Sequence, residues 1–319
     1  RHFGRLAAHQ GAIGLAATFR DARDDRRRHE QDDGAPRGQA RETRRRRRGA
    51  AGARARVPAP LADRVRARRI DQLEQPQHLV REHALDDEFG DRALPVALDV
   101  TDARQISAAV AAAADAWGGL DVLVNNAGHG YLSAVEEGED AEVRKLFDVN
   151  YFGSVDVMKA VLPGMRAQGS GHIVNISSMT GLVANPPNAY YSSTKFALEA
   201  VTEALATEVA PLGIKVTLVE PGAFRTDWAS RSMKESGTPI ADYADVAARK
   251  DLIKQFADHL PGDPRKVAEA VLMVVGLDDP PLRLLLGRDV LKAVRDRLAA
   301  FSASIEEWAP VTKDVNFPS

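Results

Sequence analysis

The sequence predicts an α/β fold built on a doubly wound parallel sheet, and two observations support this. From about Leu85 onward, short apolar runs alternate with patterns typical of helices, which is the order that parallel βαβ units require. Polar residues follow the apolar runs, at the edge where open parallel sheets bind their ligands. We therefore expect one globular domain over residues 85–319, with a binding site along that edge.

The first 84 residues differ in composition from the rest of the 319-residue chain. Up to residue 85 there are 21 Arg, no Lys and 11 acidic residues, whereas the remainder has 12 Arg, 10 Lys and 34 acidic residues. The segment repeats Arg, Gly and Pro with little hydrophobic periodicity, so it should not bury enough apolar surface to fold. We expect residues 1–84 to be disordered, or to be a non-native reading of GC-rich sequence.

An arginine-rich arm of this kind could bind nucleic acid or an anionic membrane. Such binding needs aromatic residues or a helical pattern to organise the charges, and neither is present in the segment. Nucleic-acid binding is therefore not expected.

Composition excludes several classes of function. The chain has no cysteine, which excludes disulfides, zinc–thiolate sites and cysteine nucleophiles and favours a reducing, cytoplasmic location. No apolar run approaches the ~18 residues of a transmembrane helix, so no membrane partner is expected. His129 and His172 have no sequence neighbours that indicate catalysis or metal binding, and we interpret them as turn and surface residues. No metal site is predicted.

The elements of the expected domain follow from local patterns. Short apolar runs bounded by turn residues predict strands at 93–100, 120–128, 172–177, 215–222 and 282–287. Apolar residues that recur with helical spacing predict helices at 101–119, 139–169, 189–210, 264–277 and 289–307. Because strands and helices alternate, the strands should be parallel, with helices on both faces of the sheet.

The helix predicted at 189–210 carries the first chemical signal. Tyr191 and Lys195 are four residues apart and lie on one helix face, whereas Tyr190 points about 100° aside. A phenol has an unperturbed pKa of about 10, and a nearby ammonium lowers that pKa toward a value suited to exchanging a proton with an alcohol or carbonyl. A solvated helix face would show the same spacing, so spacing alone leaves both interpretations open.

A second signal follows the strand predicted at 172–177. Ser178 lies thirteen residues before Tyr191, at the edge where the ligand is expected. Its hydroxyl could hydrogen-bond a substrate oxygen and stabilise developing charge there. The preceding Ser177 is expected to face the sheet or to cap the turn.

In this order and spacing, the motifs resemble those of the short-chain dehydrogenase/reductase family. The resemblance covers about Leu85 to Ser319 and depends on LDVTD, NNAG, FDVNYFG, IVNISSMTG, YSSTK and PGAFRT. The segments NNAGHGYLSAVEE, PGAFRTDW and PLRLLLG look like the branch of 17β-hydroxysteroid and retinol dehydrogenase-like proteins. The resemblance implies a Rossmann-like fold and an oxidoreductase that transfers a hydride between NADP or NAD and an alcohol or carbonyl substrate.

The resemblance also implies roles for individual residues. Tyr191 would be the general acid/base, and Lys195 would adjust its pKa and bind the nicotinamide ribose. Ser178 would hold the substrate carbonyl, and Asn150 would anchor a helix kink and a water of the proton relay. Asp99 and Val100 would contact the adenine, Asn126, Ala127 and Gly128 would line the cofactor, and Pro221, Gly222 and Thr226 would hold the nicotinamide carboxamide.

Each of these residues also has a purely structural interpretation. Asn125 and Asn126 could form a turn, and Asn150 could be a helix-interior residue bonded to the backbone. Pro221 and Gly222 could be ordinary loop residues, and Asp99 could mark the start of a helix. The functional interpretation depends on the joint order of the motifs.

The expected substrate is a small alcohol or carbonyl compound with apolar surface. The insert at 224–256 is expected to form a mobile lid, in which Trp228, Met233 and Tyr243 would either contact the substrate or simply pack. A 3-oxoacyl-carrier reductase is a second candidate within the same class of enzyme. Homo-oligomers through the helices at 140–167 and 189–210 are implied by the resemblance alone.

One motif of the family is missing. The family opens with a strand, a T-G-x-x-x-G-x-G turn and a helix, whose amides bind the cofactor pyrophosphate. GAIG at 11–14 has the wrong spacing and no strand before it, and GAAG at 49–52 lies in an arginine tract. The sheet is therefore expected to be incomplete at its N-terminal βαβ unit, with an open edge. The alternative to an active oxidoreductase is an inactive or poorly folding degenerate scaffold that acts, if at all, as a binding protein.

Overall fold

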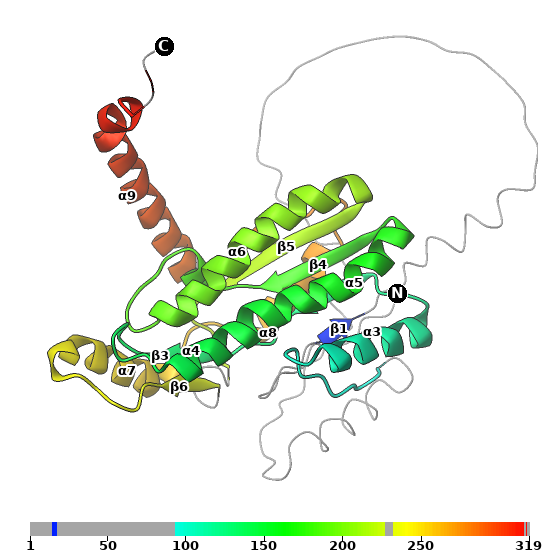
Figure 1. The fold of residues 1–319 in the computed structure, drawn as a ribbon, viewed down its shortest axis with the longest axis horizontal. Coiled ribbons are helices and arrows are strands. Elements are labelled where there is room, and N and C mark those ends of the chain that lie inside the picture. Colours follow the sequence, from blue (N-terminus) through cyan, green and yellow to red (C-terminus); the bar gives the residue numbers. More distant parts are fainter. Residues whose placement is uncertain (1–14, 18–92, 227–231, 316, 318–319) are drawn as a thin grey trace, which may run out of the picture.

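A parallel sheet forms the centre of the structure, a computed structural model that describes residues 15–17, 93–226, 232–315 and 317 (Figure 1). The strand order is β1-β2-β4-β5-β7. The strands are β1 (Leu15–Ala17), β2 (Val122–Asn125), β4 (Gly171–Ile176), β5 (Ile214–Pro221) and β7 (Arg283–Leu286). Every neighbouring pair is parallel except β1 with β2, which is antiparallel.

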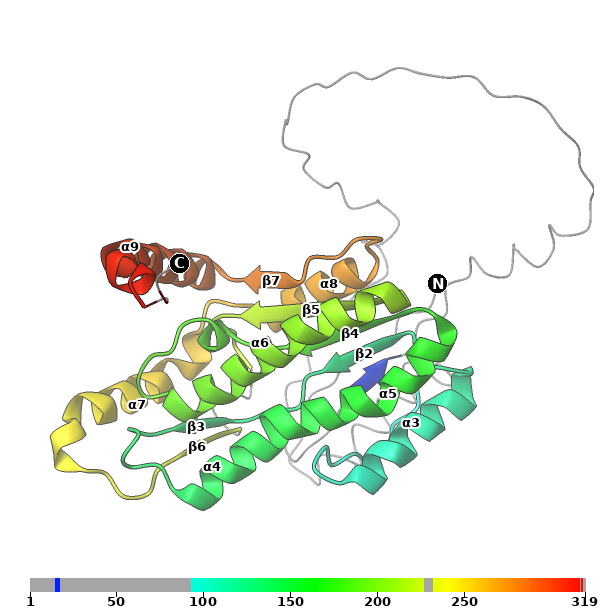
Figure 2. The ribbon, with the colours of Figure 1, turned by 45° about the horizontal axis from the view of Figure 1, so that its top comes forward.

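Helices cover both faces of this sheet (Figures 1 and 2). On one face lie α3 (Ala103–Trp117), α5 (Ser154–Gln168) and α6 (Ala189–Val209), and on the other lies α8 (Pro264–Val275). A second sheet pairs β3 (Gly130–Leu132) with β6 (Met233–Glu235) near α4 (Asp140–Phe147) and α7 (Ala244–Phe256). The predicted α/β class with helices on both faces is confirmed.

The core shows the two-residue alternation of strands that are buried on both faces. Leu123 and Ile173 pack with α3, α5 and α6, whereas Val122, Val124 and Val174 pack with Val271 of α8. Successive strand side chains point to opposite faces, so each strand supplies both halves of the core. This explains why the predicted strands are nearly continuous apolar runs.

Local signals set the ends of the helices. Asp102 caps α3 by accepting hydrogen bonds from the amides of Arg104 (2.8 Å) and Gln105 (3.4 Å). The helix ends at Gly118, whose φ of 79° lies in the left-handed region that glycine adopts without strain. Asp263 caps α8 in the same way, and Pro264 follows at its first position.

Two features of the sheet correct the sequence analysis. The strand predicted at 93–100 is absent, although Leu98 and Val100 of this segment are buried in the core. A strand exists only with a hydrogen-bonding neighbour, and no strand pairs with this segment in the described part of the chain. The edge beside β2, expected to be open, holds the three antiparallel residues of β1.

The predicted helix at 139–169 is interrupted. A π-helical turn, Asp148–Gly153, separates α4 from α5 and contains the buried Asn150. Such turns are rare and are frequently found at functional sites. This irregularity fits the expected role of Asn150 in anchoring a kink.

The C-terminal helix α9 (Arg288–Lys313) starts beside β7 and then leaves the body of the protein as a single arm (Figures 1 and 2). It is longer than the helix predicted at 289–307. The division of the chain at residues 84 and 85 stays a prediction, because residues 18–92 lie outside the described part. The same holds for both glycine-containing segments of the N-terminal region, GAIG and GAAG.

Candidate active site

The expected site edge exists, because β2, β4 and β5 run parallel and end side by side. Asn125 at the end of β2 is in register with Asn175, and Ile176 at the end of β4 is in register with Val219. The polar segments that follow these strands therefore emerge at one edge of the sheet, as predicted.

Tyr191 and Lys195 lie one turn apart on α6 and are both buried, with exposed fractions of 6% and 5%. The Lys195 Nζ is 5.8 Å from the centre of the Tyr191 ring. The same Nζ donates a hydrogen bond to the carbonyl of Ile176 at 2.9 Å. Tyr190 is turned away, and its hydroxyl donates to the carbonyl of Val135 at 2.7 Å. Tyr191, the tyrosine four residues before the lysine, is therefore the one that shares the buried site with it.

The pKa values of this pair are set by burial. Burial raises the pKa of Tyr191 to about 12, and a hydrogen bond with Ser178 opposes that rise. Burial lowers the pKa of Lys195 to about 8, opposed by the charge of Glu199. The expectation that the ammonium depresses the pKa of Tyr191 is thus not met in this arrangement, in which the Nζ is hydrogen-bonded to Ile176 instead.

Ser178 lies at the N-terminal cap of a short 3-10 helix, Met179–Gly181. Its Oγ accepts hydrogen bonds from the amide of Thr180 at 3.2 Å and from the hydroxyl of Thr180 at 3.0 Å. Because these bonds use its acceptor capacity, its own proton is available to Tyr191 or to a substrate oxygen. Ser178 is the serine that caps the turn, and Ser177 is buried.

Asn150 connects three parts of the site. Its Oδ1 accepts from the amide of His129 at 3.0 Å, and its Nδ2 donates to the His129 carbonyl at 2.9 Å and to the Thr194 hydroxyl at 3.3 Å. Gly128 packs so closely here that a Cβ would lie 3.1 Å from Asn150 Oδ1 and 3.7 Å from Lys195 Nζ. The structure therefore brings together Gly128, Asn150, Ser178, Tyr191 and Lys195.

Other predicted cofactor residues lie outside this group. Val100 is buried in the core and packs against Gly153, whose added Cβ would lie 2.6 Å from Val100 Cγ2. The Asp99 carboxylate accepts from the amide (2.9 Å) and hydroxyl (2.7 Å) of Thr101, which forms a turn before α3. Asp99 therefore forms the turn that precedes α3, and Asp102, not Asp99, caps the helix.

The remaining predicted residues follow the strands. Asn126 and Ala127 come directly after β2 and are partly buried. Pro221 ends β5, and Gly222 lies against Asp289 of α9, whose carboxylate accepts from the amide of Ala223 at 2.9 Å. Thr226, the last described residue of this loop, is exposed.

A buried amide ladder that the sequence analysis missed supports the site edge. Asn125 Nδ2 donates to Asn175 Oδ1 at 2.9 Å, and Asn175 Nδ2 donates to Thr202 Oγ1 at 2.9 Å. The ladder ties β2, β4 and α6 together below the reactive residues. Asn125 is therefore a strand residue, which corrects its interpretation as a turn. The sequence signal that could have revealed the ladder is that Asn125 and Asn175 each lie near the end of a predicted strand.

His172 corrects another interpretation, because it is buried in β4 and not on the surface. Its Nε2 lies 3.0 Å from the hydroxyl of Thr217 on β5. Burial lowers the pKa of His172 to about 4, so the ring is neutral near pH 7. His129 lies in the turn after β2, as expected.

Buried charges also went unpredicted. Glu137 and Lys250 form an ion pair at 3.2 Å, with side chains only 1% and 6% exposed. Below the site, Arg283 Nε lies 3.1 Å from Glu199 and 3.8 Å from Glu220, and Glu220 is fully buried. Isolated Glu, Lys and Arg residues give no signal in a sequence that would reveal such pairing.

The insert at 224–256 is anchored to the body of the protein by the Glu137–Lys250 ion pair and by contacts of its own residues. Met233 begins β6 and pairs with Gly130, while the Tyr243 hydroxyl donates to Glu136 at 2.7 Å. These contacts hold both residues against the body of the protein. Trp228, the third residue expected in the lid, lies outside the described residues.

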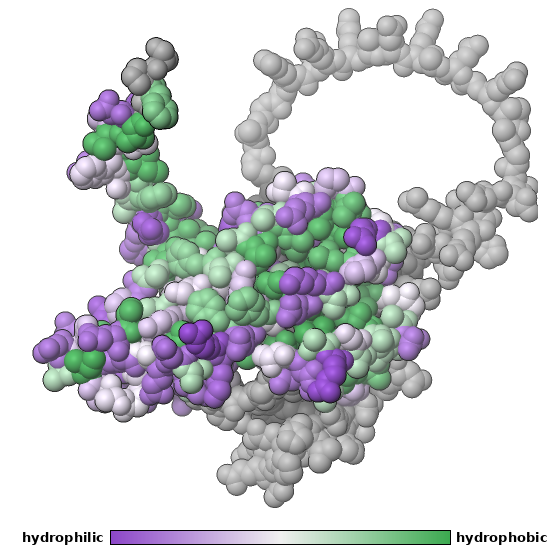
Figure 3. Space-filling view, viewed as in Figure 1, coloured by the Kyte–Doolittle hydropathy of each residue, from purple (hydrophilic) through white to green (hydrophobic). Residues whose placement is uncertain are grey.

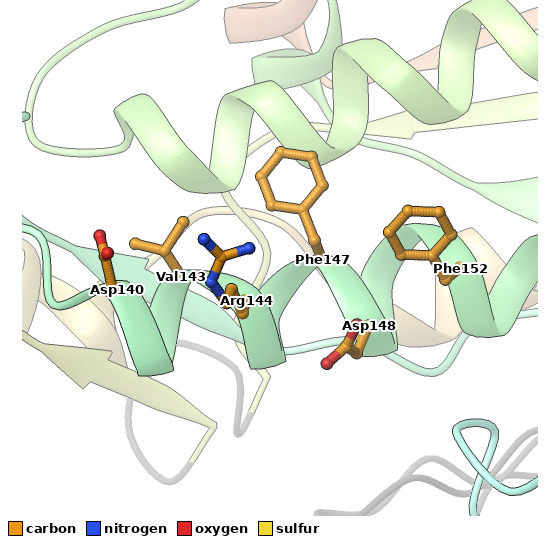
Figure 4. Close-up of a pocket in the computed structure, with 6 residues that line it drawn as sticks. All are labelled: Asp140, Val143, Arg144, Phe147, Asp148 and Phe152. Atoms are coloured by element: carbon orange, nitrogen blue, oxygen red, sulfur yellow. The ribbon is translucent and has the colours of Figure 1, made fainter.

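A surface depression lies along α4 and the π-helical turn Asp148–Gly153 (Figure 4). Its volume is about 420 Å³, and its lining combines two aromatic rings with charged residues: Asp140, Val143, Arg144, Phe147, Asp148 and Phe152. It shares no residue with the predicted catalytic group and is not the active-site candidate.

Comparison with known proteins agrees with this geometry. The family model "short chain dehydrogenase" matches residues 64–237. Oxidoreductase BOA17 of Botryotinia fuckeliana is 40% identical over 221 residues, covering 69% of this chain and 81% of that protein. The 3-ketodihydrosphingosine reductase of Bacteroides thetaiotaomicron is 40% identical over 191 residues, covering 60% and 71%.

Solved structures give the same result. A short-chain dehydrogenase from Streptomyces avermitilis aligns with a TM-score of 0.68 and 40% identity, covering 73% of this chain and 85% of that one. A short-chain dehydrogenase from Burkholderia cenocepacia, solved in complex with NADP, aligns with a TM-score of 0.53 and 27% identity, covering 68% and 81%.

The chain belongs to the short-chain dehydrogenase/reductase family. It is an oxidoreductase of that family, whose chemistry is hydride transfer between a nicotinamide cofactor and an alcohol or carbonyl compound. These findings do not favour the alternative of a degenerate scaffold. Within the described residues, no helix is both long and apolar enough to cross a bilayer.

Proposed function

We propose that Tyr191 is the general acid/base of this oxidoreductase and that Lys195, Ser178 and Asn150 assist it. The observation that carries the proposal is the convergence of all four on one buried site. Lys195 is one turn from Tyr191, Ser178 hydrogen-bonds Tyr191, and Asn150 contacts the loop that holds Gly128 against Lys195. These residues come from separate motifs, and three elements meet to place them.

The residues present fit a nicotinamide cofactor. Gly128 leaves room for the edge of a ligand ring at a position where a side chain would press against Asn150. The buried Lys195 offers donors beyond the one bonded to Ile176, which suits ribose hydroxyls. Asn126, Ala127 and Pro221 to Thr226 would line the same edge. A bound nicotinamide would supply or accept the hydride.

The protein's own residues would move the proton. In carbonyl reduction, Tyr191 would donate its phenolic proton to the substrate oxygen as that oxygen gains charge. Ser178 would donate a hydrogen bond to the same oxygen. The Lys195 ammonium would then stabilise the phenolate that Tyr191 leaves. We propose Asp99 and Val100 only as neighbours of the adenine, through their backbone, because their side chains are already engaged.

We propose an apolar carbonyl or alcohol as the substrate. The similarity to a 3-ketodihydrosphingosine reductase supports a ketone on an aliphatic chain. The complex of the Burkholderia cenocepacia structure supports NADP as the cofactor, with NAD as the other candidate. The lack of cysteine supports a cytoplasmic location. Self-association through α4, α5 and α6 is supported by the exposed rings of Phe152 and Phe196.

The test is a comparison of two adjacent tyrosines. Tyr191→Phe should lower the turnover of NADPH with an aliphatic ketone by about 100-fold or more, because general acid catalysis contributes that much. The affinity for NADPH, measured by fluorescence titration, should stay within about threefold. Tyr190→Phe is the matched control and should retain turnover within about tenfold. An active Tyr191→Phe enzyme would refute the assignment.

A further inference from the structure

Helix α9 carries an apolar stripe, which we call the α9 seam, that the described elements leave uncovered. Five of its six residues are between 41% and 59% exposed. From Arg295 to Val315, every residue except Ala309 is exposed. Hydrophobic residues follow the projecting arm in Figure 3. The seam residues are Leu291, Val294, Leu298, Phe301, Ile305 and Trp308.

The spacing of the seam is that of a helix built to pair with another helix. Its residues recur at intervals of 3, 4, 3, 4 and 3, which places them at the a and d positions of a heptad. Such a narrow stripe faces one partner helix, whereas a helix packed on a globular core carries a broader apolar face. Because helices without tertiary contacts are marginal in water, a projecting arm of 26 residues is expected to need a partner.

The balance of charged residues on α9 favours a protein partner over an anionic bilayer. Helices that lie on membranes are rich in Lys and Arg on the polar face. In α9, five basic residues are nearly balanced by four acidic ones. The charges are also segregated along the helix. Residues 288–300 contain four basic and two acidic side chains, and residues 301–313 contain one basic and two acidic side chains.

The seam is complementary to itself in the antiparallel direction. With a two-fold axis between Ala299 and Ala300, every a residue of one helix faces a d residue of the other. The opposed pairs are Leu291 with Trp308, Val294 with Ile305, and Leu298 with Phe301. The basic half of each helix then lies beside the acidic half of the other, whereas a parallel pair would place like halves together. An isologous contact of this kind closes with two copies.

We propose that the α9 seam binds a second copy of this chain, through an antiparallel pairing of two α9 helices. This surface is separate from α4, α5 and α6, so the two modes of association can be tested independently. The pairing would join two bodies through their C-terminal arms.

The first test is the mass of the full chain in solution, measured by light scattering after gel filtration. The wild type should have at least twice the chain mass of 34.5 kDa. The double variant Leu298→Glu/Phe301→Glu should have half the wild-type mass. The matched control Ala300→Glu/Ala303→Glu adds the same charge to exposed positions outside the seam and should keep the wild-type mass. Far-UV circular dichroism would confirm that both variants fold.

Three outcomes would overturn the proposal. They are a monomeric wild type, a seam variant with the wild-type mass, or equal loss of mass in both double variants. If the wild type is monomeric and co-sediments with phosphatidylserine vesicles, the seam is a lipid-binding face instead. Phe152→Glu alters the separate surface at α4, α5 and α6. It should not change the loss of mass that the seam variant causes.

The second test measures direction and uses the absence of native cysteine. Leu291→Cys and Trp308→Cys chains, oxidised separately, should form no disulfide dimer, because neither position faces itself in the antiparallel pair. Mixed before oxidation, they should form a covalent dimer on non-reducing gels. A disulfide dimer of Leu291→Cys alone would show a parallel pair and reject the proposed geometry.

Discussion

Asn150 shows how a single polar side chain can hold an active site together. It bonds both backbone groups of His129 and the hydroxyl of Thr194, and it is fully buried. Each bond lost with this side chain therefore leaves a polar group inside the site without its partner. The position of Gly128 against Lys195 depends on the same contacts.

We therefore expect Asn150→Ala to lower the free energy of unfolding by about 2–3 kcal/mol, since a buried group left without its partner costs about 1–3 kcal/mol. Urea denaturation would measure this loss. Asn188→Ala is the matched control, because the Asn188 Oδ1 is buried without a partner among the described residues. The control should lose less than about 1 kcal/mol. Equal losses in the two variants would contradict the role assigned to Asn150.

The site residues Asn150, Ser178, Tyr191 and Lys195 could be predicted from the sequence, but their contacts could not. Tyr191, Lys195 and Ser178 were predictable because spacing along one helix and position after one strand are local properties. Glu137, Lys250 and Glu220 were not, because their roles arise from partners far away in the chain. The pKa of Tyr191 was also beyond the sequence, since it depends on how deeply the ring is buried and where the Lys195 ammonium points.

The insert containing β6 and α7 is held to the body by one buried cluster. Glu137 accepts hydrogen bonds from the amides of Ala134 (3.1 Å) and Ile240 (2.9 Å), from the Ser236 hydroxyl (3.2 Å) and from Lys250 (3.2 Å). The bonds from the amides of Ile240 and Ala134 and from Lys250, with that of Ile240 foremost, lower the pKa of Glu137 to about 2. The cluster determines where the insert lies beside the site.

Removing the carboxylate should therefore leave Lys250 as an uncompensated buried charge. We expect Glu137→Ala to lower the free energy of unfolding by about 3–5 kcal/mol. Lys250→Met should have a smaller effect, because Glu137 keeps its other three donors. The matched control is Lys254→Met. Lys254 lies on the same helix as Lys250, α7, and its pair with Glu235 is exposed, so its loss should change the free energy of unfolding by less than about 1 kcal/mol. Chemical denaturation of the three variants would decide, and a large loss in the control would contradict the argument.

The same contrast between local and distant causes explains which elements could be predicted. Helix α3 has its cap, its periodicity and its terminal glycine within one stretch, and its bounds were predicted to within two residues. The segment 93–100 has the composition of a strand, but strand pairing is a property of two segments. The π-helical turn at 148–153 is invisible in the apolar pattern, which continues through it.

Considered together, the buried charges make the stability of the protein depend on pH in a defined direction. Burial raises the pKa of Glu220 to about 8, with the charge of Glu199 adding to the rise and that of Arg283 opposing it. A raised carboxyl pKa stabilises the folded state fully below the unfolded value near 4.5. That stabilisation is lost progressively as the pH rises from near 4.5 through about 8, because the unfolded chain ionises over this range while the buried carboxyl of the folded protein does not.

Replacing the Glu220 carboxyl by an amide of the same shape should remove the loss of stability at high pH. We expect Glu220→Gln to match the wild type at pH 5 and to exceed its melting temperature by about 5 °C or more at pH 9, since each pKa unit corresponds to about 1.4 kcal/mol and each kcal/mol to about 2–4 °C. Differential scanning calorimetry across pH 5–9 would measure it. Glu208→Gln, at an exposed position on α6, should follow the wild-type profile. If Glu220→Gln were instead less stable than the wild type at pH 9, the ionised carboxylate paired with Arg283, and not the neutral carboxyl, would be the form that stabilises the folded protein.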